Sequence, residues 1–109
     1  MGRKFSKYHG AGNDFVMIDG RTEPFDATPE RVAALCRRRT GIGADGLMIL
    51  ESDPAEEFRM RYFNADGGEA TMCGNGGRCI ALFAHHLGIG GMRKRLIGVD
   101  GPHTAEIGR

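Results

Sequence analysis

Apolar and basic residues alternate most clearly at residues 58–63, which read Phe-Arg-Met-Arg-Tyr-Phe. A period of two indicates a β-strand with one buried face. Other segments with strand-like composition are residues 3–9, 15–18, 47–50, 95–99 and 104–107. The chain is therefore expected to form a sheet of several strands.

The most apolar segment predicts a different element. Residues 79–84 read Cys-Ile-Ala-Leu-Phe-Ala, an unbroken apolar run. This run is too apolar for a surface helix and suits a helix that is buried on several sides. Several strands around one very apolar helix indicate the α+β class.

A second helix is expected to begin at residues 28–30, Thr-Pro-Glu. A capping hydroxyl, a proline at the first helical position and an acid in the first turn all favour a helix start. Val32, Leu35 and Cys36 have the spacing of one helix face, so we expect Cys36 to pack in the core. The three arginines at 37–39 are placed in the last turn, as a solvated helix end and not a nucleic-acid site.

Composition narrows the class of protein. The chain has 109 residues, 40% hydrophobic and 27% charged, which indicates one folded domain. A net charge of +1 gives no electrostatic reason to expect nucleic acid or a membrane surface as partner. No signal-type or membrane-spanning segment is expected. Three cysteines favour a reducing cytoplasm over a disulfide framework.

The stretch from Asn64 to Cys79 contains the strongest candidate chemistry. Cys73 is expected just before the buried helix, with the Gly-Asn-Gly-Gly run at 74–77 in its first turn. The free N–H groups of a helix start bind anions and also stabilise a thiolate. The segment is thus a candidate for holding a carboxylate and for presenting a reactive sulfur. A glycine-rich turn with a cysteine that merely packs is the alternative, and the spacing alone leaves both open.

Other motifs are interpreted as structural. Residues 41–46 match G-x-G-x-x-G, but they follow a helix and precede a strand, which reverses the nucleotide-binding context. Asn13 and Asp14 are expected in a turn, where their side chains bond to nearby backbone. Cys73 and Cys79 lack Cys-x-x-Cys spacing, and no nearby histidine pair has zinc-finger spacing, so no metal site is expected.

Four segments together resemble the diaminopimelate epimerase family. They are His9-Gly-Ala-Gly-Asn-Asp-Phe15, Gly41-Ile-Gly-Ala-Asp-Gly46, Phe63-Asn-Ala-Asp-Gly67 and Met72-Cys-Gly-Asn-Gly-Gly-Arg-Cys79. Their order and spacing resemble the amino-terminal half of that enzyme, from residue 3 to the end. The last segment is highly specific, and related proline racemases and phenazine-type isomerases lack the full set.

The resemblance implies a fold and an activity. The fold has two α/β domains, each a mixed sheet curled around a central apolar helix. Residues 1–109 would be the amino-terminal domain, and the carboxy-terminal domain is missing. The implied reaction is the cofactor-independent interconversion of LL- and meso-diaminopimelate, on the route to lysine and peptidoglycan. The implied partners are this small-molecule substrate, the missing domain and, as in many family members, a second copy in a homodimer.

The resemblance also implies roles for particular residues. Cys73 corresponds to one of two catalytic cysteines, and the backbone N–H groups of Gly74 and Asn75 to the site for the substrate α-carboxylate. The side chains of Asn13 and Asn64 correspond to substrate contacts. The second cysteine belongs to the missing domain, so the chain alone is expected to be inactive.

Three positions depart from the family pattern. Some relatives carry glutamine where this chain has Gly46, so whether this position contacts the substrate stays open. Gly68 and Gly77 replace the more usual serine and alanine, changes expected to be tolerated. Two alternatives stay open: a non-catalytic truncated domain that binds a small amino acid or a partner chain, and a related cofactor-independent racemase or isomerase with another substrate.

Overall fold

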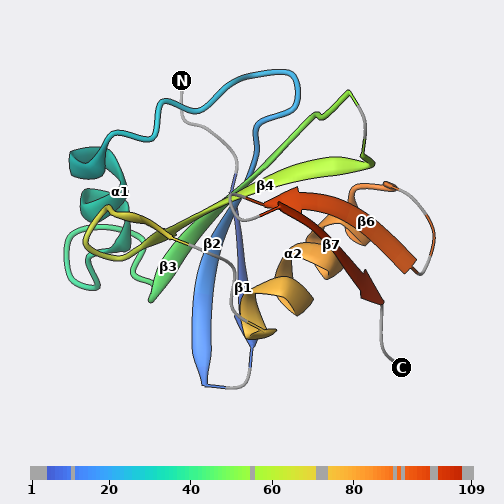
Figure 1. The fold of residues 1–109 in the computed structure, drawn as a ribbon. Coiled ribbons are helices and arrows are strands. Elements are labelled where there is room, and N and C mark those ends of the chain that lie inside the picture. The colour runs from blue at the N-terminus through green and yellow to red at the C-terminus, as the bar shows by residue number, and fades with distance from the viewer. Residues whose placement is uncertain are drawn as a thin grey trace.

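A mixed sheet and two helices make up the fold in the computed structural model (Figure 1). The structure describes residues 5–10, 12–54, 56–70, 74–89, 91, 93–98 and 101–106. In chain order the elements are β1 (Ser6–Gly10), β2 (Asn13–Asp19), α1 (Pro29–Cys36), β3 (Gly46–Glu51), β4 (Phe58–Asn64), β5 (Glu69–Ala70), α2 (Gly74–His86), β6 (Arg93–Gly98) and β7 (Gly101–Glu106).

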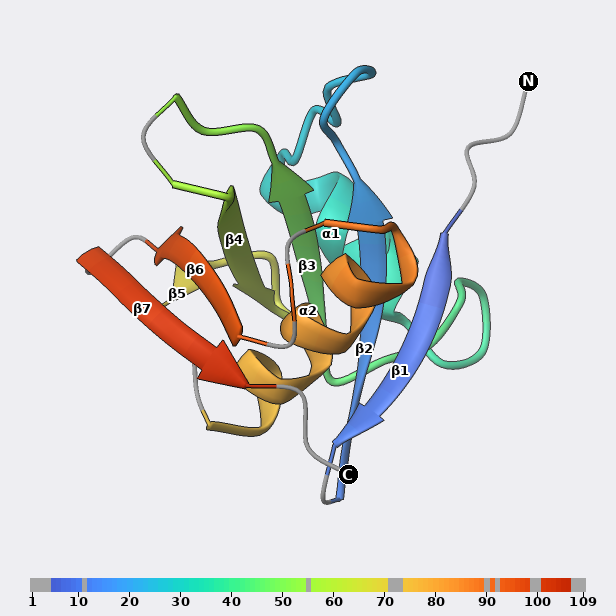
Figure 2. The same cartoon turned by 90° about the vertical axis from the view of Figure 1, so that its right-hand side faces the viewer.

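The sheet has seven strands in the order β1-β2-β3-β4-β6-β7, with β5 paired to β4. The pairs β2–β3 and β4–β6 are parallel and the other pairs are antiparallel. The strands at the two ends of this order, β1 and β7, both contact α2. The sheet therefore curls around α2 (Figure 2), which confirms the expected α+β fold with a central apolar helix.

Each face of the sheet has its own core. Along β2 and β3, alternate residues point to opposite faces because side chains alternate along a strand. The core on the α2 face contains Phe15, Met17, Met48, Leu50, Phe58, Met60, Cys79, Ile80, Phe83, Ala84 and Leu96. The core on the α1 face contains Val16, Ile18, Phe25, Val32, Cys36, Ala44, Leu47, Ile49 and Phe63. Both faces of β2 and β3 are covered, which explains their unbroken apolar runs.

The connection between β1 and β2 is shorter than the sequence pattern indicated. Gly10 pairs with Asn13, so β2 begins at Asn13 and not at Phe15. Gly12 has φ +87°, a left-handed conformation that glycine adopts without a steric penalty. The expectation that Asn13 and Asp14 lie in a turn was therefore wrong, because this tight reversal leaves both residues in the strand.

Helix α1 begins as predicted but ends early. The Thr28 side chain accepts a hydrogen bond from the Arg31 N–H, at 3.2 Å, and Pro29 opens the helix. The helix ends at Cys36, and Arg37 is extended. The placement of the arginines at 37–39 in the last turn was wrong, because residues of the following loop bond to the terminal carbonyl groups in place of another helical turn.

Two of the three cysteines are described, and both pack in the core. Cys36 and Cys79 are each 4% exposed, which confirms the prediction for Cys36. Within the described part of the chain, no helix is long and apolar enough to cross a membrane.

Candidate active site

Two asparagines that were predicted to contact the substrate lie at the ends of neighbouring strands. Asn13 is the first residue of β2 and Asn64 the last residue of β4. Gly46, the first residue of β3, pairs with Asn64 on one side and with Phe15 on the other. Asn13 and Asn64 therefore lie at the same end of the sheet, on the two strands that flank β3.

The first turn of α2 lies at this same end. Gly74 and Asn75 are the first two residues of α2, and Figures 1 and 2 both place this turn near the β1–β2 connection. A helix start carries unpaired N–H groups and a partial positive charge, which together favour an anion. Cys73, the predicted catalytic residue, lies outside the described residues.

The glycines of the loop before β3 are required by packing. A Cβ atom on Gly41 would lie 2.1 Å from the Ala34 carbonyl oxygen, and one on Gly46 would lie 2.8 Å from that of Phe63. Gly43 has φ +86°. This loop follows the end of α1 closely, with the Gly43 N–H bonded to the Leu35 carbonyl oxygen at 3.0 Å. The motif therefore serves to fold the loop back against α1 and into β3.

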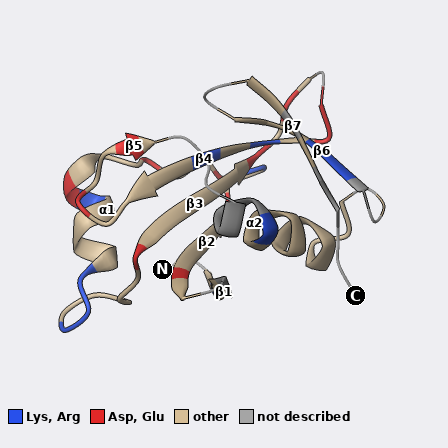
Figure 3. Ribbon diagram, turned by 60° about the horizontal axis from the view of Figure 1, so that its bottom comes forward, with Lys and Arg blue, Asp and Glu red and all other residues tan. Residues whose placement is uncertain are grey.

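This loop carries an ion-pair network that sequence analysis missed. Arg38 donates two hydrogen bonds to the carboxylate of Asp14, at 3.0 and 2.9 Å, and one to Asp45 at 3.2 Å. Lys7 lies 3.1 Å from Asp14. In Figure 3 the loop after α1 is blue and acidic segments lie near it. Only 8% of Asp14 is exposed, and its hydrogen bonds from Arg38 hold the pKa of that carboxyl far below its usual range.

The two aspartates also bind each other's backbone. The Asp14 N–H donates to Asp45 Oδ2 at 3.1 Å, and the Asp45 N–H donates to Asp14 Oδ1 at 2.9 Å. The same Asp45 Oδ2 accepts a hydrogen bond from Asn13 Nδ2 at 3.4 Å. A sequence signal existed, since each aspartate stands next to a predicted strand and an arginine run lies between them. That signal did not identify the pairing.

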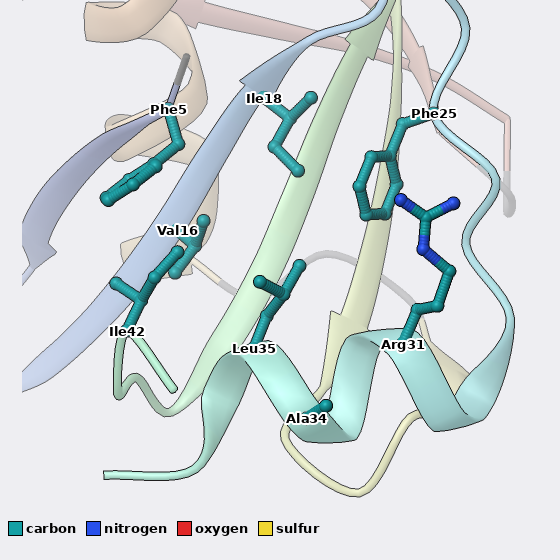
Figure 4. Close-up of a pocket in the computed structure, with 8 residues that line it drawn as sticks. All are labelled: Phe5, Val16, Ile18, Phe25, Arg31, Ala34, Leu35 and Ile42. Carbon is teal, nitrogen blue, oxygen red and sulfur yellow. The ribbon is translucent and has the colours of Figure 1, made fainter. Parts of the chain in front are cut away.

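A large apolar pocket lies elsewhere, between α1 and the neighbouring strands (Figure 4). Its volume is about 510 Å³, and it is lined by Phe5, Val16, Ile18, Phe25, Arg31, Ala34, Leu35 and Ile42. Arg31 lies over the ring of Phe25, 4.6 Å from its centre. Neither Asn13 nor Asn64 lines this pocket, so it is separate from the end of the sheet that holds them.

Known proteins resemble the chain in sequence. A model of the family described as diaminopimelate epimerase matches residues 5–103. The diaminopimelate epimerase of Chlorobaculum tepidum is 56% identical over 97 residues, which cover 89% of this chain and 38% of the relative. That of Flavobacterium psychrophilum is 50% identical over 105 residues, which cover 95% and 41%. The chain thus spans about two fifths of the length of these curated relatives.

Solved structures resemble it in fold. A phenazine biosynthesis protein of the PhzF family from Bacillus anthracis superposes with a TM-score of 0.64 at 20% identity, over 95% of this chain and 34% of that one. A PhzF-family protein from Enterococcus faecalis gives 0.68 at 11% identity, over 89% and 35%. At such identities the similarity establishes the fold alone.

Proposed function

Because the chain belongs to the diaminopimelate epimerase family, we propose that it is the amino-terminal domain of a cytoplasmic, cofactor-independent epimerase. The substrate is LL- or meso-diaminopimelate, a precursor of lysine and peptidoglycan. The observation that carries the proposal is the convergence of Asn13, Asn64 and the first turn of α2 at one end of the sheet.

The start of α2 is the proposed site for the α-carboxylate. The N–H groups of Gly74 and Asn75 are among the first four of the helix, which have no partner within it. The helix has 13 residues, and its dipole favours negative charge at this end. Negative charge grows on the carboxylate as the α-proton leaves, so these N–H groups bind the transition state more strongly than the ground state.

Cys73 is the proposed acid or base on one face of the substrate. It precedes the first residue of α2, where the field of the helix start stabilises a thiolate. Epimerisation breaks the Cα–H bond on one face, with the proton passing to one sulfur. A second acid then delivers a proton to the opposite face of the carbanion. We assign that second group to a cysteine of a carboxy-terminal domain that lies outside these 109 residues.

The isolated chain is therefore proposed to be inactive. One positioned acid or base contributes about 10²- to 10⁴-fold to a rate. Loss of the second domain also removes the opposite wall of the site, so the deficit exceeds that range. The second candidate is a non-catalytic domain that binds a small amino acid at the same helix start.

Complementation with the missing half tests the proposal. The carboxy-terminal part of the Chlorobaculum tepidum relative, beyond the region matched by this chain, is expressed separately and mixed with it. We expect no conversion of LL- to meso-diaminopimelate by either part alone and measurable conversion by the mixture. The control is Cys73→Ala in the same mixture, which should abolish conversion. Turnover by the chain alone that Cys73→Ala removes would contradict the two-domain mechanism, and a complex without turnover would favour the non-catalytic candidate.

A further inference from the structure

Asp45 connects the glycine loop to a proposed substrate contact. We propose that Asp45 is a positioning residue that orients the side-chain amide of Asn13 for the substrate, and that Arg38 and Asp14 hold Asp45 in place. This inference rests on the proposed role of Asn13 in substrate binding. It also assigns a function to the loop at 41–46, because the glycines of this loop account for its packing alone.

The orientation of the amide follows from hydrogen-bond chemistry. Asp45 Oδ2 lies 3.4 Å from Asn13 Nδ2. An ionised carboxylate only accepts hydrogen bonds, so the amide must turn its NH₂ group, and not its oxygen, toward Asp45. The Oδ1 atom of Asn13 then faces away from Asp45. An acceptor suits the ammonium groups that an amino-acid substrate carries.

Asp45 is held although it lies partly in solvent. Its side chain is 43% exposed, yet Oδ1 accepts from Arg38 at 3.2 Å and Oδ2 accepts from the Asp14 N–H at 3.1 Å. The Asp45 N–H in turn donates to Asp14, whose carboxylate accepts two hydrogen bonds from Arg38. Paired charged hydrogen bonds of this kind restrict both partners in geometry. Two hydrogen bonds to the carboxylate of Asp45 and one from its backbone N–H therefore fix the orientation of this side chain.

A purely structural role is the competing interpretation. In that case the network only joins the loop to β2, and its loss lowers stability without affecting binding through Asn13. Asp19 offers a matched control, because it lies at the other end of β2 and its carboxylate pairs with Arg21 at 2.9 Å. Its side chain is 35% exposed, similar to that of Asp45.

A double-mutant cycle on the full 109-residue chain separates the two roles. Binding of meso-diaminopimelate is followed by ¹H–¹⁵N spectra, which also record the side-chain NH₂ signals of Asn13. We expect Asn13→Ala and Asp45→Ala each to raise Kd about tenfold, the scale of one hydrogen bond. The Kd of the double variant should be no higher than that of either single variant, since Asp45 acts through Asn13. Asp45→Asn keeps an acceptor oxygen and should stay within about threefold of the unmodified chain.

The outcomes distinguish this inference from the proposed function. Asp19→Ala should leave Kd unchanged. Additive effects of Asn13→Ala and Asp45→Ala, or a normal Kd in Asp45→Ala, would overturn the positioning role while leaving Asn13 as a substrate contact. A normal Kd in Asn13→Ala, or no binding by the unmodified chain, would overturn the substrate role of Asn13 and this inference with it. Where Asp45→Ala unfolds, Arg38→Ala takes its place, because Arg38 holds Asp45 through a hydrogen bond at 3.2 Å. A normal Kd together with unmoved Asn13 NH₂ signals in Arg38→Ala would then overturn the positioning role.

Discussion

Arg38 donates two hydrogen bonds to the carboxylate of Asp14, at 3.0 and 2.9 Å, although the two residues are 24 positions apart in the sequence. The pair joins the loop after α1 to the start of β2, where Asp14 is the second residue. Asp14 is 8% exposed, whereas the Arg38 side chain is 56% exposed. The buried partner is therefore the one whose loss should be costly, because a carboxylate out of water depends on its donors.

Asp14→Asn should lower the free energy of unfolding by about 1–3 kcal/mol at pH 7, because the hydrogen bonds to a charged carboxylate are lost. Solvent around the exposed Arg38 side chain limits the size of this loss. Arg38 lowers the pKa of Asp14 in the folded protein, so the stabilisation is complete above the unfolded pKa of about 3.9 and is lost as pH falls below it. Urea unfolding at pH 7, 4 and 3 should show that the difference in free energy of unfolding between the unmodified chain and Asp14→Asn becomes smaller as the pH falls. Asp19→Asn, which removes a surface pair, should cost less than about 1 kcal/mol. A difference that is constant with pH would contradict the ionic role of Asp14.

Cys73 should be the thiol most readily alkylated in the folded chain. Cys36 and Cys79 are each 4% exposed, and burial, followed by the charge of Asp14, raises the pKa of the Cys36 thiol. Both effects slow the reaction, since the thiolate is the nucleophile. Iodoacetamide labelling followed by peptide mapping should find Cys73 modified at least about tenfold faster than either. In urea the three rates should converge, and faster labelling of Cys36 or Cys79 in the folded protein would refute the placement of Cys73.

Gly41→Ala should destabilise the fold by about 1–3 kcal/mol, the usual cost of forcing extra atoms into a packed region. The added methyl group would lie 2.1 Å from the Ala34 carbonyl oxygen and 2.8 Å from that of Leu35. Gly91→Ala is the matched control, because nothing lies within 4 Å of its added carbon, and it should change stability by less than about 0.5 kcal/mol. Equal thermal midpoints for the two variants would show that the loop at 41–46 does not depend on this close approach.

An acid ligand should bind at the start of α2. Titration of the chain with meso-diaminopimelate should move backbone amide signals most at residues 74–77, because their N–H groups face the proposed carboxylate site. Affinity should be weak, since these 109 residues supply only one side of the proposed site and the ordering cost is not offset. Acetate serves as a comparison ligand and should move the same signals less. Shifts that are largest at residues 37–39 would instead indicate attraction to surface arginines.

Much of the fold followed from local patterns. The alternation at 58–63 predicted β4, and the apolar run at 79–84 predicted the buried part of α2. The Thr28 cap was also predictable, because a capping hydroxyl bonds to an N–H only three residues away. These features depend on neighbours within one or two turns of chain, so the order of residues contains the information.

The candidate site was predictable only in part. The motifs named Asn13 and Asn64, and the structure places both at one end of the sheet through their pairing with β3. The role of Asp14 in a turn and the place of Arg38 in a helix were both wrong. In each case the prediction used only the neighbouring residues, whereas the hydrogen-bond partner of the polar residue lies far away in the sequence.

The pairing of polar groups that lie far apart in the sequence depended on the folded chain. Lys94 is fully buried although basic residues flank it, and its ammonium group donates to the Ile89 carbonyl oxygen and lies 3.5 Å from His85 Nδ1. No periodicity predicts such burial, because a charge leaves water only where the fold supplies acceptors. Short-range spacing in the sequence was enough to predict most of the elements and the family. The Arg38–Asp14–Asp45 network depended on the chain folding first, because its atoms meet only when β2 and β3 lie side by side.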